Sequence, residues 1–101
     1  RVDGNHIYIY TDIDDKSLLF LKLNLENNVK LQTNLDINPG IKKKYLPIDI
    51  HIASNGGDLF SGFGMYDILK DCEYQINTYI EGFAASAATF LFLGGKNRFM
   101  T

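Results

Sequence analysis

The side chains best suited to chemistry lie in one short segment, Gly82-Phe83-Ala84-Ala85-Ser86-Ala87-Ala88. Ser86 stands where a strand-like stretch, 74–80, gives way to a helix-like stretch, 87–93. Small neighbours let a substrate carbonyl approach the hydroxyl, and a helix that starts directly after it points free backbone N–H groups at a developing oxyanion. The pattern predicts a nucleophilic serine and a hydrolytic reaction, with tight packing of a small-residue run as the alternative.

A glycine turn upstream provides a second candidate element. Isoleucines alternate with polar residues over 48–53, which predicts a strand with one face on the core. The segment that follows, Ser54-Asn55-Gly56-Gly57-Asp58, contains paired glycines that can adopt positive φ and bring an N–H close to a ligand. Asp58 is a predicted N-cap for the next helix. The apolar positions of that helix recur at helical spacing, at Leu59, Phe63, Tyr66 and Leu69, with Ile68 beside them.

The order of these elements predicts the fold class. The chain runs strand, glycine turn, helix, strand, serine turn, helix. We expect an α/β fold in which right-handed crossovers stack helices on a mainly parallel sheet. Successive strand-to-helix turns of a parallel sheet open at the same edge, so Gly57 and Ser86 should converge there.

The N-terminal half is expected to supply a strand over 6–10 and then a helix. Asp12, Asp14 and Asp15 precede that helix, and helix capping explains them better than a calcium loop, because the required glycine and distal glutamate are missing. Leucines alternate like a strand from 19 to 25, but helical spacing also fits, and we predict a helix that runs toward Leu35. Its apolar positions are Leu18, Leu21, Leu25 and Val29.

Three segments in order resemble the ClpP serine peptidases, the proteolytic subunit of the caseinolytic protease. Residues 46–57 are similar to the strand and glycine turn of that family, and 80–88 to its nucleophile segment. Between them, 62–69 resembles the family's helix with its Tyr-Asp pair, here Tyr66-Asp67. The likeness covers 46–100 well and the rest in outline, and it is greatest to the compact phage-type members. It implies a ClpP/crotonase-like fold.

The resemblance implies a role for each residue of the two turns. Ser86 would be the nucleophile, and the backbone N–H groups of Gly57 and Ala87 would form the oxyanion hole. Gly56 and Asp58 would offer backbone to an extended polypeptide substrate, which pairs as an added strand. The resemblance also implies a homo-oligomeric ring, an ATP-driven unfoldase partner, and no cofactor.

The general base is the missing part. In the family it is a histidine well downstream of the serine, oriented by an acid further on, and this chain ends at Thr101. His6 and His51 are expected to be ordinary strand side chains. We therefore expect residues 1–101 to be a single ClpP-like domain, truncated before the family's His and Asp. Two alternatives are a catalytically inactive ClpP-like assembly subunit and a crotonase-like acyl-CoA enzyme, which usually has glycine where Ser86 stands.

Composition and charge narrow the class of protein and its possible partners. With 46% hydrophobic and 13% aromatic residues the chain is globular, and a net charge of −2 gives no reason to expect nucleic-acid binding. Lys42-Lys43-Lys44 is predicted to be a solvated loop within a connection over 36–46, and Gly94-Gly95-Lys96 a helix C-terminal turn.

Cys72 is the only cysteine, which excludes an internal disulfide and a cysteine-based metal cluster. No apolar stretch is long enough to span a bilayer. We expect a protein of the cytoplasm of a bacterial or phage-infected cell.

Overall fold

The computed structural model describes residues 1–34 and 46–100. Five strands and three helices are present in this part: β1 (Val2–Asp3), β2 (His6–Ile9), α1 (Asp15–Asn34), β3 (Ile48–Ser54), α2 (Leu59–Asp71), β4 (Ile76–Ala84), α3 (Ala87–Leu93) and β5 (Asn97–Met100). The lysine run 42–44 and most of the connection predicted around it lie outside the described residues.

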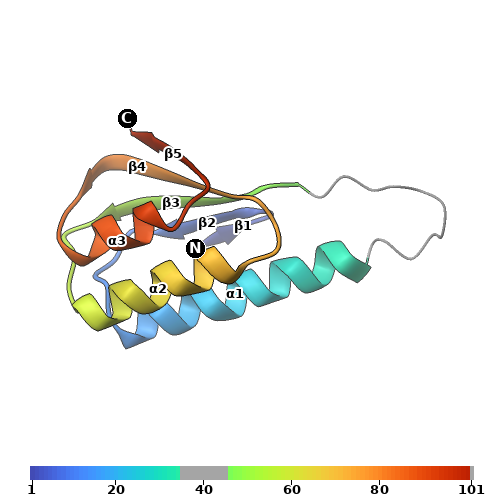
Figure 1. The fold of residues 1–101 in the computed structure, drawn as a ribbon, viewed down its shortest axis with the longest axis horizontal. Helices are drawn as coiled ribbons and strands as arrows, with labels where there is room; N and C mark the ends of the chain where they lie inside the picture. Colours follow the sequence, from blue (N-terminus) through green and yellow to red (C-terminus); the bar gives the residue numbers. More distant parts are fainter. Residues whose placement is uncertain (35–45, 101) are drawn as a thin grey trace.

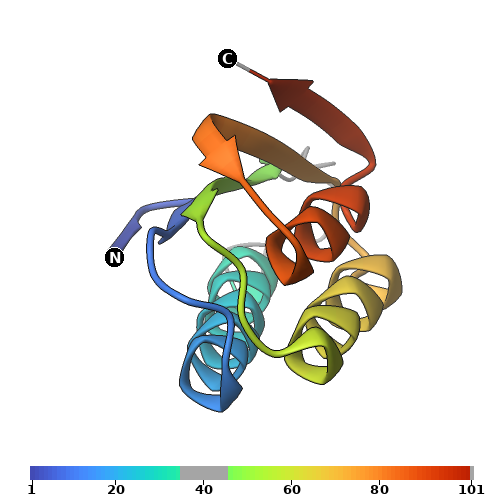
Figure 2. The same cartoon turned by 90° about the vertical axis from the view of Figure 1, so that its left-hand side faces the viewer.

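The strands form one sheet in the order β1-β2-β3-β4-β5. Neighbours from β2 to β5 pair in parallel, and β1 pairs antiparallel with β2. All three helices lie on the same side of this sheet and leave its other face uncovered (Figures 1 and 2). The predicted α/β class with a mainly parallel sheet is confirmed. The short strand β1 was not predicted, because two exposed residues carry no alternation.

The core lies between the sheet and the helices. Alternate residues of β3 point into it, so that Ile48, Ile50 and Ile52 have no exposed surface. Ile7 and Ile9 of β2 are equally enclosed. The helices contribute the opposing layer, which includes Leu21, Leu25, Met65, Leu69 and Leu91. The period of two in the sequence therefore marks the buried side of β3 correctly, and β2 alternates in the same way.

Helix α1 begins at a reciprocal cap. The backbone N–H of Ser17 donates to Asp14 Oδ1 at 2.9 Å, and the N–H of Asp14 donates to Ser17 Oγ at 2.9 Å. This arrangement satisfies N–H groups that have no acceptor inside the first turn. Of the three acidic residues, Asp14 therefore caps the helix, and no group of three metal-ligating side chains occurs in the described ranges.

Helix α2 is turned differently from the sequence-based expectation. Its buried residues are Ser61, Gly62, Met65 and Leu69, whereas Leu59 and Phe63 are 47% and 46% exposed. The cause is close helix packing, because a Cβ on Gly62 would lie 2.8 Å from the carbonyl oxygen of Ala87 in α3. The two helices meet along small residues, which leaves the larger apolar side chains outside.

Strand β4 starts later and ends later than predicted, at Ile76 and Ala84. Ile52 of β3 pairs with Ile80, but Ser54 pairs with Ala84, so β4 holds extra residues at this point. Gly82, with φ of +92°, provides the bend. The segment that leads to Ser86 is thus strand almost to its end. At the far end of α3 the predicted turn is confirmed, with Gly94 N–H bonded to Leu91 O at 3.1 Å.

Candidate active site

Ser86 occupies a strained backbone position. Its φ of 51° and ψ of −119° make it the one non-glycine residue with positive φ in the described part of the chain. Such a conformation costs an L-residue about 1–3 kcal/mol. Ser86 is the N-cap of α3, yet its side chain makes no capping hydrogen bond, and the residue is exposed. A strained, exposed serine between a strand and a helix is the geometry in which hydrolases present a nucleophile.

The serine turn rests directly on the glycine turn. The N–H of Ala85 donates to Ser54 O at 3.1 Å, which joins the ends of β4 and β3. A Cβ on Gly56 would lie 2.6 Å from Ala85 O and 3.0 Å from Ser86 Cβ. Only glycine leaves room for this approach, and its φ of +101° is also one that glycine tolerates. The two predicted turns thus meet at one edge of the sheet.

Ile13 holds the glycine turn from the other side. Its N–H donates to Gly56 O at 2.7 Å, and its carbonyl accepts from Asp58 N–H at 2.8 Å. These bonds use the residues on either side of Gly57, so the N–H of Gly57 itself points away from Ile13. Sequence reasoning missed Ile13, because a single isoleucine among acidic residues carries no local signal of this pairing.

The start of α3 supplies a second backbone donor beside Ser86. Helical bonds begin with Ala88 N–H to Ala85 O at 3.1 Å and Thr89 N–H to Ser86 O at 3.0 Å. Ala87 is the first helical residue, and a first-turn N–H has no acceptor within its own helix. Its methyl group is fully buried. The side chain therefore anchors the helix, and the backbone N–H lies at the start of the helix, next to Ser86 in the chain.

Asp58 uses its carboxylate to cap α2. Its oxygens accept from Phe60 N–H at 3.2 Å, Ser61 N–H at 3.3 Å and Ser61 Oγ at 2.8 Å. The hydrogen bond from the Ser61 hydroxyl is the main cause that lowers the pKa of Asp58. This carboxylate is engaged within the protein, and so is the backbone of Asp58, whose N–H donates to Ile13 O and whose carbonyl accepts from Gly62 N–H at 3.0 Å.

We expect Asp58→Ala to lower the midpoint of thermal unfolding at pH 7. Because the pKa of Asp58 is lower in the folded than in the unfolded protein, the charged cap stabilises the fold above the ordinary aspartate pKa of about 3.9. That contribution disappears as the pH falls through the lower folded value. Thermal melts between about pH 2 and pH 7 should show the gap between wild type and variant narrowing on acidification.

Asp58→Asn is the matched control for this prediction, because asparagine caps a helix about as well as aspartate but does not titrate. The gap in melting midpoint between Asp58→Asn and Asp58→Ala should therefore stay the same across this pH range. A gap between wild type and Asp58→Ala that does not change with pH would contradict the assigned role of the charge.

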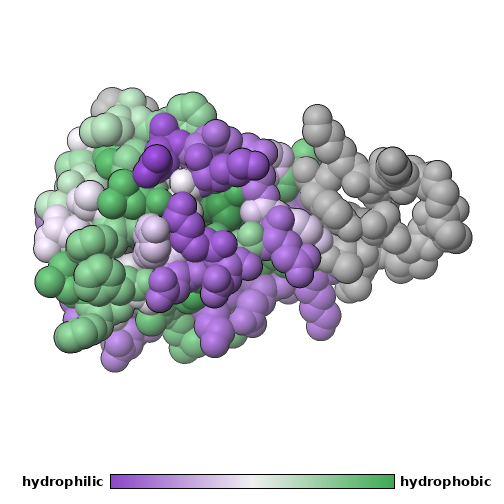
Figure 3. Space-filling view, in the orientation of Figure 1, coloured by the Kyte–Doolittle hydropathy of each residue, from purple (hydrophilic) through white to green (hydrophobic). Residues whose placement is uncertain are grey.

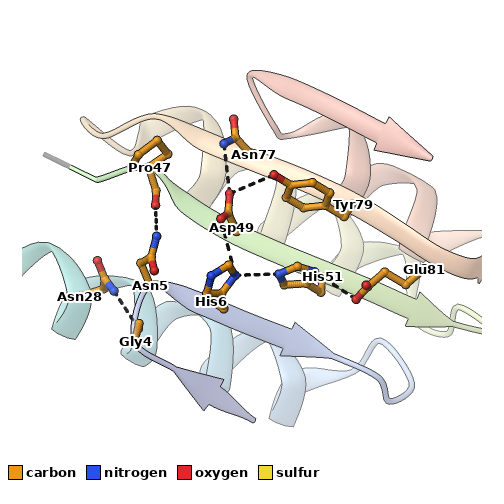
Figure 4. A network of polar contacts seen from close by, with 10 residues as sticks. All are labelled: Gly4, Asn5, His6, Asn28, Pro47, Asp49, His51, Asn77, Tyr79 and Glu81. Atoms are coloured by element: carbon orange, nitrogen blue, oxygen red, sulfur yellow. Dashed lines mark hydrogen bonds and ion pairs between the residues drawn. The ribbon is translucent and has the colours of Figure 1, made fainter. Parts of the chain in front are cut away.

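Both histidines of the chain lie on the uncovered face of the sheet (Figure 4). His6 Nδ1 is 2.9 Å from His51 Nε2, and the pair is flanked by Asp49 and Glu81. They are strand side chains, as expected, and they bind each other and these carboxylates. Neither is arranged as a partner of Ser86.

The fold places the chain in a class of known structure. ClpP1 from Listeria monocytogenes superimposes with a TM-score of 0.80 over 97% of this chain and 52% of that chain, at 23% sequence identity. The N165D mutant of the same protein gives the same values. The architecture is therefore that of ClpP. The model of the Clp protease family matches residues 3–101, and the chain belongs to that family.

Curated relatives agree with this assignment. An ATP-dependent Clp protease proteolytic subunit of Cuscuta reflexa is 34% identical over 98 residues, and that of Cucumis sativus is 29% identical over 99. The match covers 94% and 93% of this chain, respectively, and 49% of each relative. A subunit of Salinibacter ruber is 43% identical over 51 residues. The chain spans about half the length of the first two relatives.

Helices that could span a membrane are absent from the described ranges, since none is both long and apolar enough.

Proposed function

We propose that this chain carries the nucleophile and the oxyanion-binding groups of a serine peptidase of the Clp type. The observation that carries the proposal is the backbone of Ser86, which is strained, exposed and supported directly by the Gly56-Gly57 turn. Strain at a single non-glycine residue persists where the surrounding structure requires it, and functional sites are where it concentrates. Membership of the family supports the same reading.

The proposed reaction begins with attack of Ser86 Oγ on a peptide carbonyl. As the C–O bond forms, the carbonyl oxygen takes up negative charge, which the N–H groups of Gly57 and Ala87 would stabilise. The hydroxyl proton passes to a histidine base, which later returns it to the leaving amine. The two histidines of this chain are engaged elsewhere, so the base would come from the rest of the protein. Water then releases the acyl group from Ser86.

The substrate would be an extended polypeptide. The backbone N–H and carbonyl groups of Gly56 and Asp58 are bonded within the protein, so these two residues would hold the turn in place while the backbone of Gly57 between them pairs with a strand laid across the site edge. The family assignment favours this reaction over the crotonase-like alternative. An inactive assembly subunit is the competing proposal, and labelling of Ser86 distinguishes the two.

The test is reaction of the full-length protein with a fluorophosphonate, with the modified peptide located by mass spectrometry. We expect a single adduct on Ser86, and no adduct in Ser86→Ala. The isolated 101-residue chain should react far more slowly, because it lacks the base. A folded full-length protein that is not labelled would overturn the peptidase proposal and favour the assembly subunit.

We further propose a homo-oligomeric ring, with an ATP-driven unfoldase as partner, in the cytoplasm. Apolar surface gathers at the end of the molecule where α2 begins and α3 lies (Figure 3). Phe60 is 84% exposed there, and the ring of Phe63 packs on Phe90 with centroids 4.5 Å apart. Exposed apolar surface of this kind is typical of subunit interfaces.

If this surface joins subunits, Phe60→Glu should dissociate the ring in sedimentation velocity experiments. The fold itself should be unaffected, because substitutions at exposed positions usually change stability by less than about 0.5 kcal/mol. Leu31→Glu is the matched control. Leu31 is also a large apolar residue, 56% exposed, but it lies near the C-terminal end of α1, away from the start of α2. Equal dissociation by both variants, or by neither, would argue against this interface.

A further inference from the structure

Four rings are stacked across the uncovered face of the sheet, one from each parallel strand. They are Tyr8, His51, Tyr79 and Phe99 of β2, β3, β4 and β5. Successive centroids are 4.6, 5.0 and 4.9 Å apart, with interplanar angles of 14°, 13° and 17°. The strand register places these residues opposite one another. The ring of His51 is therefore held in a fixed plane between Tyr8 and Tyr79.

The two nitrogens of His51 reach different strands (Figure 4). Nε2 is 2.9 Å from His6 Nδ1 on β2, and Nδ1 is 3.0 Å from Glu81 Oε1 on β4. The first contact is a hydrogen bond only while one of the two facing nitrogens is unprotonated. The second has an ion-pair distance, but buried Nδ1 makes no aligned hydrogen bond within the described residues. Its attraction to Glu81 therefore depends mainly on charge, which the ring gains on protonation.

Glu81 stands at the point where β4 leaves its register with β3. It directly precedes Gly82, the bend that leads to Ser86. Glu81 also accepts a hydrogen bond from the hydroxyl of Tyr10, just beyond β2, and this bond is the main cause that raises the pKa of Tyr10 to about 12. One carboxylate thus joins three neighbouring strands immediately before the serine turn.

Few other charges face the histidine pair. Asp49 Oδ2 is 3.5 Å from His6 Nδ1, and Asp49 also accepts from Asn77 at 3.1 Å and from the hydroxyl of Tyr79 at 3.4 Å. The guanidinium of Arg1 lies 4.3 Å from the ring centroid of Tyr8. Two carboxylates therefore flank the pair. One added proton on His51 Nδ1 places a charge beside Glu81 while Nε2–H of the same ring still donates to His6 Nδ1, and a second proton on the pair would break the bond between the rings.

We propose that Glu81 is a positioning residue for Ser86. Protonation of the His6–His51 pair would strengthen the contact between His51 and Glu81, and Glu81 would then restrict motion of the bend at Gly82. A positive charge on the pair attracts Glu81 through His51 Nδ1, while Tyr10 holds the same carboxylate from β2. The bend is then fixed on both sides, and with it the end of β4, which leads to Ser86. The catalytic meaning of this coupling rests on the proposed function, but the coupling itself does not.

The test is a titration of the full-length protein by NMR between about pH 5 and pH 8, the range in which histidine changes charge. The histidine ring protons and the backbone amides of Gly82 and Ser86 are followed together. We expect the amides to shift with the same midpoint as the rings. Glu81→Gln should remove the amide response while the rings still titrate, because the amide side chain accepts from Tyr10 but carries no charge.

Two further variants make the test decisive. Asp49→Asn is the control, since Asp49 contacts His6 but not the bend, and it should leave the amide response in place. His51→Phe keeps the stacked rings and removes both nitrogens, so it should abolish the response even if Glu81→Gln does not fold. The proposal is overturned if the amide shifts of Gly82 and Ser86 do not change with the histidine titration in the wild type. It is also overturned if they change in the same way in His51→Phe. If the amides respond as expected but Ser86 fails to react with a fluorophosphonate, the proposed function fails and the coupling stands.

Discussion

Gly57→Ala is expected to destabilise the protein by about 3 kcal/mol or more, which is a large part of the 5–15 kcal/mol that holds a domain folded. A Cβ at this position would overlap the carbonyl oxygen of Ile13 and lie 3.1 Å from its carbonyl carbon and nitrogen. The φ of +143° adds a conformational cost that only glycine avoids. Because the obstructing atoms are backbone, no side-chain rotation can relieve the overlap. Urea unfolding followed by circular dichroism measures the loss.

Gly82→Ala is the control that separates overlap from backbone strain. Gly82 also has positive φ, at +92°, but a Cβ there would meet nothing within 4 Å. We expect it to cost about 1–2 kcal/mol, from conformation alone. Equal losses in the two variants would show that contact with Ile13 contributes nothing, and the glycine turn would then be held by its dihedral angles only.

Ser86→Gly is expected to abolish reaction with a fluorophosphonate and, at the same time, to stabilise the fold by about 1 kcal/mol. Glycine adopts a φ of 51° without the strain that serine bears, and this gain exceeds the entropy that glycine loses on folding. The side chain of Ser86 makes no capping bond, so its removal costs α3 nothing. Labelling assays and urea unfolding of the same preparation would measure both effects.

Ser86→Ala completes this experiment. It removes the hydroxyl but keeps a Cβ, so it should be as unreactive as Ser86→Gly without being more stable than wild type. The difference between alanine and glycine then reports the strain at this position. A glycine variant less stable than the alanine variant would mean that the backbone of Ser86 is relaxed, and the argument from strain would fail.

Much of the fold could be predicted from local patterns. The alternation over 48–53 marks β3, and the Asp58 cap marks the start of α2. Asp14 and Ser17 likewise act within one turn of α1. These signals are readable because the interacting residues are close in sequence, where a period or a turn residue has a direct structural meaning.

Predictions were wrong where distant segments decide the outcome. Helical spacing groups Leu59 and Phe63 with Leu69, but the close approach of Gly62 to Ala87 leaves those two side chains exposed while Leu69 is buried. Strand β4 was expected to end at Ile80, but its renewed pairing of Ala84 with Ser54 extends it. Helical spacing describes which residues share a face, and only the neighbouring helix determines which face is buried.

The sequence by itself determined the α/β class and the two turns at Gly56-Gly57 and Ser86, because turn chemistry and residue periods are local properties, and the resemblance of its motifs indicated the Clp protease family. Only the tertiary structure showed that Ile13 holds the glycine turn and that Ser86 is strained. It alone revealed the line of contacts from His6 through His51 to Glu81. These features depend on segments that are distant in the sequence, and their geometry follows from sheet register and packing, which no single segment encodes.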